Sequence, residues 1–260
     1  MTTIRRSAET SSSRGRAEND WRERTALVTG ASQGIGRAIA LALAARGATV
    51  WVVGRNPAAL DEVVATAQAG GGDARALVAD LTSEDDLERL LSELKDAGAQ
   101  VDLLVHCAGK IFHGRLDSAA VEDFDAQYRS NVRAPYRLTQ ALLPSLVARE
   151  GEVVFMGSSI AGRARAGVGQ FAATQSALKA VADTLRVEVN SSGVRVLSVF
   201  PGRTATPRQK EIHALEAKEY RPDELIQPDD VASIVISALE LPRTAEVTEI
   251  SMRPFANPST

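Results

Sequence analysis

The sequence predicts an α/β protein built on one doubly wound parallel sheet, with helices covering both faces. Short apolar runs alternate with segments of helical periodicity, which is typical of parallel strands joined by right-handed helical crossovers. The short runs are continuously apolar, as expected for strands covered on both faces. Residues 23–255 contain no internal repeat and no linker, so we expect a single domain.

The predicted elements follow in a regular order. Strand 25–28 leads into a glycine-rich turn and a helix over 34–46, which Gly47 ends. Apolar runs predict the later strands at 49–53, 76–78, 101–105, 152–155, 194–200 and 247–251. Helical periodicity predicts the later helices from about 58 and at 83–97, 121–149, 170–190 and 227–239.

Composition restricts the partners that we expect. A formal charge of −3 provides no broad basic field, so nucleic acid is not an expected partner. No apolar run approaches the roughly 20 residues that cross a bilayer. Cys107 is the only cysteine, which excludes an internal disulfide and suits a reducing compartment. We therefore expect a cytoplasmic protein that binds a small molecule and no metal.

Residues 1–22 are predicted to form a flexible tail. They contain three consecutive serines, the four arginines Arg5, Arg6, Arg14 and Arg16, and almost nothing to bury. Their acidic residues, and the lack of an apolar stretch, argue against a targeting peptide. The folded domain is expected over residues 23–260.

The turn after the first strand carries a phosphate-binding pattern. It reads Thr-Gly-Ala-Ser-Gln-Gly-Ile-Gly over residues 29–36. Gly30 permits the sharp turn, while Gly34 and Gly36 let the backbone approach a pyrophosphate and the helix lie close to the sheet. Free N–H groups and the helix dipole then favour phosphate. This strand–turn–helix context predicts a Rossmann-type dinucleotide site that includes Gly30, Ser32, Gln33, Gly34, Ile35 and Gly36.

Arg55 indicates which dinucleotide is bound. It follows the second predicted strand, about 20 residues beyond the glycines. A carboxylate there would bind the ribose 2′-hydroxyl of NAD, whereas an arginine matches a 2′-phosphate. We expect NADP(H), with a solvated Arg55 as the alternative.

Several motifs, in order along residues 23–254, resemble those of the short-chain dehydrogenase/reductase family. The glycine turn resembles its TGxxxGxG motif, and Asp80-Leu81 resembles the pair that contacts adenine. Residues 106–109 stand at its NNAG position, with only Ala108 and Gly109 retained. Residues 201–204 resemble the loop that contacts the nicotinamide. The resemblance implies that the cofactor also contacts Asp80, Leu81, Ala108, Gly109, Gln175, Pro201, Gly202 and Thr204.

The catalytic residues that the resemblance implies are partly replaced. Asn131 matches the Asn that holds a proton-relay water, and Ser159 matches the Ser that polarises the substrate carbonyl. The family follows this Ser with Tyr-x-x-x-Lys, in which the Tyr transfers a proton and the Lys lowers its pKa and binds the nicotinamide ribose. Phe171 and Gln175 stand at these two positions.

These substitutions remove ionisable groups. Phe171 keeps the aromatic shape but has no hydroxyl, and Gln175 can bind a ribose hydroxyl without bringing a positive charge. Loss of a general acid typically costs about 10²–10⁴ in rate. We expect the family's usual mechanism to be severely impaired.

Other residues are candidates for the pocket. Lys110, His113, Ser159 and Phe171 are expected near the substrate, and His113 titrates closest to neutral pH. The alternative for Lys110 and His113 is an ordinary polar loop position.

Three further residues are weaker candidates for the site. Lys179 lies two turns beyond Phe171 as a possible substitute cation, with a solvated helix position as the default. Tyr128 shares a helix face with Asn131 and is a candidate for the pocket, with packing or a subunit contact as the alternative. His106 is expected to be structural.

Three functions remain open at this stage. The first is an NADP(H)-dependent oxidoreductase for a carbonyl or alcohol, with a surrogate acid or reduced activity. The second is a non-redox enzyme, such as a lyase, isomerase or cyclase. The third is a catalytically silent NADP(H)-binding protein. Natural and engineered loss of the Tyr and Lys are both open.

The resemblance also implies that the protein forms oligomers and that one segment closes over the substrate. Family members form dimers or tetramers through the two long helices, here about 121–149 and 170–190. The charged segment 206–222 matches the variable region that closes over substrate, with a solvated helix as the alternative.

Overall fold

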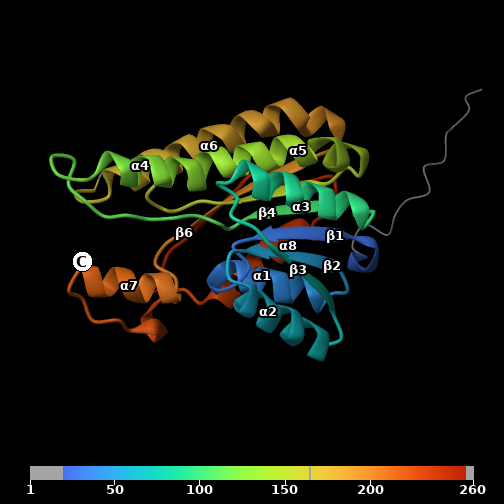
Figure 1. Cartoon of the computed structure of the whole chain (residues 1–260), viewed down its shortest axis with the longest axis horizontal. Coiled ribbons are helices and arrows are strands. Elements are labelled where there is room, and N and C mark those ends of the chain that lie inside the picture. The colour runs from blue at the N-terminus through green and yellow to red at the C-terminus, as the bar shows by residue number, and fades with distance from the viewer. Residues whose placement is uncertain (1–19, 164, 256–260) are drawn as a thin grey trace, which may run out of the picture.

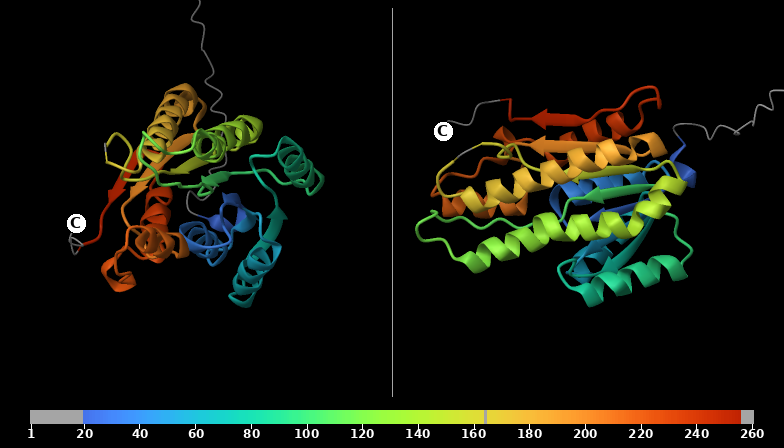
Figure 2. Two further views of the ribbon diagram at one scale, coloured as in Figure 1. Left: turned by 60° about the vertical axis from the view of Figure 1, so that its left-hand side comes forward. Right: turned by 90° about the horizontal axis from the view of Figure 1, so that it is seen from above.

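Seven parallel strands form one sheet in the order β3-β2-β1-β4-β5-β6-β7, which confirms the predicted fold class (Figure 1). The computed structural model describes residues 20–163 and 165–255. Figure 2 shows the strands side by side with their carboxyl ends at one edge of the sheet. The strands are β1 (Thr25–Thr29), β2 (Thr49–Gly54), β3 (Asp73–Val78), β4 (Leu103–His106), β5 (Glu152–Met156), β6 (Arg195–Pro201) and β7 (Glu249–Met252).

Helices cover both faces of the sheet, and each face has its own apolar core. One face is covered by α1 (Gly34–Ala44), α2 (Pro57–Ala69) and α8 (Pro228–Leu239). The other is covered by α3 (Glu84–Asp96), α4 (Val121–Tyr128), α5 (Ala134–Ala148) and α6 (Gly169–Val189).

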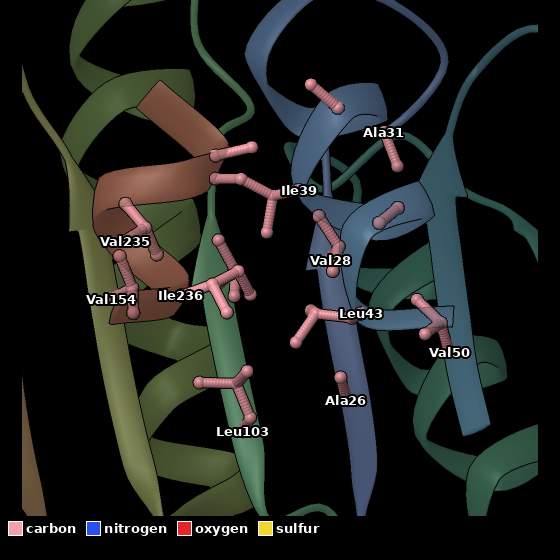
Figure 3. Packing of buried hydrophobic residues seen from close by; sticks show 14 of the residues in the cluster. Ala26, Val28, Ala31, Ile39, Leu43, Val50, Leu103, Val154, Val235 and Ile236 are labelled. Atoms are coloured by element: carbon pink, nitrogen blue, oxygen red, sulfur yellow. The ribbon is translucent and has the colours of Figure 1, made fainter. Parts of the chain in front are cut away.

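The core beneath α1 and α8 holds the glycine turn against the sheet. Ile39 of α1 and Ile236 of α8 face Val28 of β1 and Leu103 of β4 (Figure 3), and all four side chains are fully buried. Each such side chain contributes about 1.5–3 kcal/mol relative to exposure. This packing fixes the position of the helix whose first turn borders the candidate site.

The long predicted helix 121–149 contains one irregular turn. A π-helical segment, η2 (Arg129–Arg133), joins α4 to α5. Asn131 lies in this segment and is buried. π-Bulges occur frequently at functional sites because the extra residue re-aims a side chain. The apolar periodicity gives no sign of this insertion.

Two element boundaries differ from the predictions for a physical reason. β3 begins at Asp73 rather than residue 76, because an edge strand exposes alternate residues and its polar start hides the strand pattern. Trp21 lies in η1 (Trp21–Glu23), is 4% exposed and donates its indole N–H to Glu240. The predicted tail boundary at residue 22 is therefore wrong for residues 20–22, while residues 1–19 lie outside the described part.

A short helical segment stands apart from both layers, beyond the carboxyl ends of the strands (Figure 1). It consists of α7 (Pro207–Leu215) and η4 (Pro222–Glu224), and it covers most of the charged segment 206–222. We call residues 206–224 the α7 segment. The remaining 3-10 turn, η3 (Asn190–Ser192), follows α6. Within the described ranges, no helix is both long and apolar enough to cross a membrane.

Candidate cofactor and substrate cleft

One cleft of about 390 Å³ opens at the carboxyl edge of the sheet, a size typical of small-molecule sites. The loops after six strands and the α7 segment line it. Apart from the weaker candidates described below, the site residues predicted from the sequence border this cleft: Gly30, Ser32, Gln33, Gly34, Ile35, Gly36, Arg55, Asp80, Leu81, Ala108, Gly109, Lys110, Asn131, His113, Ser159, Phe171, Gln175, Pro201, Gly202 and Thr204.

The glycine turn fits against the loop after β4 with no room for side chains. Gly30 has a φ of 64°, and a Cβ there would lie 2.7 Å from the Ala108 nitrogen. A Cβ on Gly36 would lie 2.4 Å from the Gly30 carbonyl oxygen. The Thr29 hydroxyl accepts hydrogen bonds from the amides of Cys107 and Ala108, at 3.1 and 3.2 Å. The turn is therefore tightly packed and anchored.

Arg55 and Asp80 meet at one end of the cleft. The Arg55 guanidinium and the Asp80 carboxylate are 4.0 Å apart, with both side chains substantially exposed. Desolvation would raise the pKa of Asp80, but hydrogen bonds from Thr82 and the charges of Arg55 and Lys110 hold it below its usual value. The charge of Lys110 therefore acts on the Asp80 carboxylate at this end of the cleft. The sequence instead predicts that Lys110 lies near the substrate.

Asn131 ties the β4 loop to α6. Its Oδ1 accepts from the Lys110 amide at 2.7 Å, and its Nδ2 donates to the Lys110 carbonyl at 2.9 Å. The same Nδ2 lies 3.0 Å from the Thr174 hydroxyl. Asn131 thus holds the loop next to the helix that carries Phe171 and Gln175.

Gln175 is buried and incompletely hydrogen-bonded. It is 5% exposed, and its Oε1 has no partner among the described residues. A buried polar atom without a partner costs about 1–3 kcal/mol. Since Gln175 lines the cleft, a ligand with a hydroxyl or amide donor would satisfy this oxygen.

Charged residues gather where the α7 segment borders the cleft. The Glu216 carboxylate accepts from Arg203 at 2.5 Å and from Arg165 at 3.0 Å. Desolvation would raise the pKa of Glu216, but Arg203, Arg165 and Lys218 hold it below its usual value. These pairs connect the α7 segment to the loops after β5 and β6.

His113 also lines the cleft. Its Nε2 is buried and has no hydrogen-bond partner within the described ranges. Desolvation lowers the pKa of His113, so the imidazole is neutral at pH 7. A neutral imidazole is able to accept a proton.

The structure excludes two weaker candidates and supports a structural role for a third. Lys179 lies outside the cleft and forms ion pairs with Asp183, at 2.8 Å, and with Glu249. Tyr128 is 48% exposed and also lies outside it. His106 stacks on Phe155 with ring centres 5.0 Å apart, and burial lowers its pKa to about 3.

Several lining residues were not assigned from the sequence. Thr206, Arg208, Gln209, Ile212 and Glu216 come from the α7 segment, and Arg165 comes from the loop after β5. The only feature of the sequence that pointed to these residues was the high charge of the segment 206–222 as a whole. Spacing alone did not reveal which of these charges face the cleft.

No group of three or more His, Cys, Asp or Glu side chains is arranged to hold a metal ion in the portion that the structure describes. The polar groups of the cleft are instead amides, hydroxyls and ion pairs.

Comparison with known proteins gives consistent matches. The short chain dehydrogenase family model matches residues 24–217. An uncharacterized short-chain type dehydrogenase/reductase of Sinorhizobium fredii is 34% identical over 238 residues, which cover 90% of this chain and 92% of the relative.

Solved structures match over the same extent. An alcohol dehydrogenase from the archaeon Thermococcus sibiricus, complexed with 5-hydroxy-NADP, has a TM-score of 0.81 at 27% identity, over 91% of this chain and 99% of that chain. A short chain dehydrogenase of Shigella flexneri, complexed with NADP, also has a TM-score of 0.81 at 27% identity, over 90% and 98% of the two chains.

Proposed function

Because this chain belongs to the short-chain dehydrogenase family, we propose that it is an NADP(H)-binding oxidoreductase for a carbonyl or alcohol substrate. Its proton chemistry differs from the usual Tyr and Lys pair, since Phe171 and Gln175 occupy those positions. The observation that carries the proposal is the convergence of the predicted cofactor and catalytic positions on one cleft.

The chain's own residues fit the cofactor. Gly30 and Gly36 let the turn pack closely on itself and on the β4 loop, and the turn borders the cleft, where its backbone would face a pyrophosphate. The unpartnered Oε1 of Gln175 would accept a hydrogen bond from a ribose hydroxyl. Arg55 would bind a 2′-phosphate, and the NADP complexes of two structural relatives support this choice. When bound, NADP(H) supplies or accepts a hydride.

The remaining site residues would bind and orient the other parts of the ligands. Asp80 and Leu81 would contact the adenine. Ser159 would donate a hydrogen bond from its hydroxyl to the substrate oxygen. The nicotinamide would contact the loop residues Pro201, Gly202 and Thr204. The cofactor would also contact Ala108 and Gly109 in the loop after β4.

Proton transfer would fall to His113. Phe171 has no titratable group, whereas the neutral imidazole of His113 lines the same cleft with a buried, unpartnered Nε2. A neutral imidazole acts as a base when an alcohol is oxidised and returns the proton in the reverse reaction.

We also propose a cytoplasmic homodimer or homotetramer. The exposed aromatic side chains of Phe124, Tyr128 and Tyr136, which lie on α4 and α5, support an interface on this face. Light scattering of Tyr136→Glu would then show a smaller assembly than that of the wild type. The single cysteine, Cys107, supports a reducing location.

The test combines binding with reversion of the two substituted positions. NADPH fluorescence titration of the wild type should give saturable binding. Phe171→Tyr/Gln175→Lys should gain carbonyl reduction by about 10²–10⁴-fold across a substrate panel, and either single change should gain much less because the pair acts as a unit. Binding without turnover in any form would favour a non-redox enzyme or a silent binding protein, and absence of NADPH binding would end the proposal.

A further inference from the structure

We propose that Arg208, on α7, binds the pyrophosphate of the cofactor from the side opposite the glycine turn. This inference rests on the proposed cofactor binding. It assigns Arg208 a role that the motif comparison does not, and it links the position of the α7 segment to cofactor binding.

The start of the α7 segment lies against the glycine turn. A Cβ on Gly34 would lie 3.1 Å from the Thr206 methyl group. The Thr206 hydroxyl caps α7 by accepting from the Gln209 amide at 3.1 Å. The first turn of α7 is therefore held next to the backbone that is proposed to bind phosphate.

Arg208 reaches from this turn to the loop after β4. Its Nη2 donates to the Gly109 carbonyl oxygen at 2.7 Å. Both residues line the cleft, so the guanidinium lies between the α7 segment and the β4 loop. Among the described residues, the Gly109 carbonyl oxygen is the only hydrogen-bond acceptor for Arg208. A guanidinium has five N–H donors, and most of them remain available to an anion.

The local charge favours an anion at this place. Arg55, Lys110 and Arg208 are the cationic side chains that border this half of the cleft, and Asp80 is the carboxylate among them. Asp80 is already close to Arg55, at 4.0 Å. Burial lowers the pKa of Arg208; the Glu211 carboxylate opposes this shift, while repulsion between the Arg55 and Arg208 charges adds to it. A phosphate group between these side chains would offset that repulsion.

Guanidinium geometry favours the pyrophosphate. Its planar fork binds phosphate oxygens through two parallel hydrogen bonds. The Arg208 side chain is already positioned by Gly109 and by the capped first turn of α7. Cofactor binding would therefore hold the α7 segment over the cleft through this side chain.

The test compares two charge-removing changes on one helix. Arg208→Gln removes the proposed contact, and Lys210→Gln removes the same charge from an exposed position that does not line the cleft. NADPH and NADH are titrated by fluorescence at one ionic strength. Circular dichroism verifies that both variants are folded.

Arg208→Gln is expected to weaken NADPH and NADH binding by the same factor, about 10–100-fold, because both cofactors carry the pyrophosphate. Lys210→Gln should stay within about twofold of wild type. Proteolysis of the α7 segment should be slowed by NADPH in the wild type and much less in Arg208→Gln.

Wild-type affinity of Arg208→Gln for both cofactors would overturn the inference while leaving the proposed function intact. A loss confined to NADPH would also overturn it, by assigning Arg208 to the 2′-phosphate. If the wild type itself binds neither cofactor, both proposals fail.

Discussion

Phe171 and Gln175 stand one helical turn apart on α6, and both side chains line the cleft. The first keeps a ring without a hydroxyl, and the second keeps a buried amide whose Oε1 lacks a partner among the described residues. The helix therefore presents a ring and a buried amide to the cleft, at the two positions where the resemblance led us to expect an ionisable pair. The predictions below separate binding, packing and proton chemistry at this cleft.

Gln175→Met should raise the stability of the ligand-free protein and weaken cofactor binding. The change removes a buried unpartnered oxygen at nearly constant volume, which should stabilise the protein by about 1 kcal/mol. NADPH affinity should fall about fivefold through loss of one hydrogen bond. Urea denaturation and fluorescence titration measure the two effects. Gln68→Met, at an exposed position on α2, should change neither, and a destabilised Gln175→Met would contradict the prediction.

Gly36→Ala should disrupt the glycine turn. The added Cβ would lie 2.4 Å from the Gly30 carbonyl oxygen, and overpacking of this kind typically costs about 1–3 kcal/mol. NADPH affinity should fall at least about tenfold, because a displaced backbone no longer faces the phosphates. Gly169→Ala is the control, since no heavy atom lies within 4 Å of its Cβ position. Equal stability and affinity of the two variants would refute this reading of the turn.

His113→Gln should lower any turnover by about 10²–10⁴-fold while leaving NADPH affinity unchanged. Desolvation lowers the pKa of His113, so alcohol oxidation by the wild type should decline only at a pH below 6.5, the usual value of the group. The pH profile of the rate, measured for both proteins, checks this assignment. Unaltered turnover in His113→Gln would remove His113 from the proton step.

His106→Asn should reduce the acid sensitivity of folding. Burial lowers the pKa of His106 from 6.5 to about 3, so between these values the unfolded chain holds a proton that the folded chain lacks. The histidine therefore destabilises the fold as pH decreases from 6.5 towards 3, and has no such effect above 6.5. Urea midpoints measured at several pH values should decline more steeply for the wild type than for His106→Asn. Parallel curves would show that His106 does not cause the slope.

The architecture and most of the cleft could be predicted from local sequence. Apolar strand runs and helical periodicity specify a doubly wound sheet. In such a sheet all strands end at one edge, so residues that follow different strands, such as Gly30, Arg55, Gly109 and Ser159, must come together there. Their convergence on one cleft follows from topology and needs no detail of side-chain packing.

Tertiary structure decided which charged side chains act at the site. Lys179 is rotated by about 80° from Phe171 around α6, and β7 brings Glu249 beside it, away from the cleft. Glu216 meets Arg165 from a loop 51 residues away. Spacing along a helix or after a strand assigns a residue to one side of the fold. The partner of a long charged side chain, in contrast, depends on which distant segment lies within a few ångströms of it in the folded protein. That distance cannot be predicted from the local sequence.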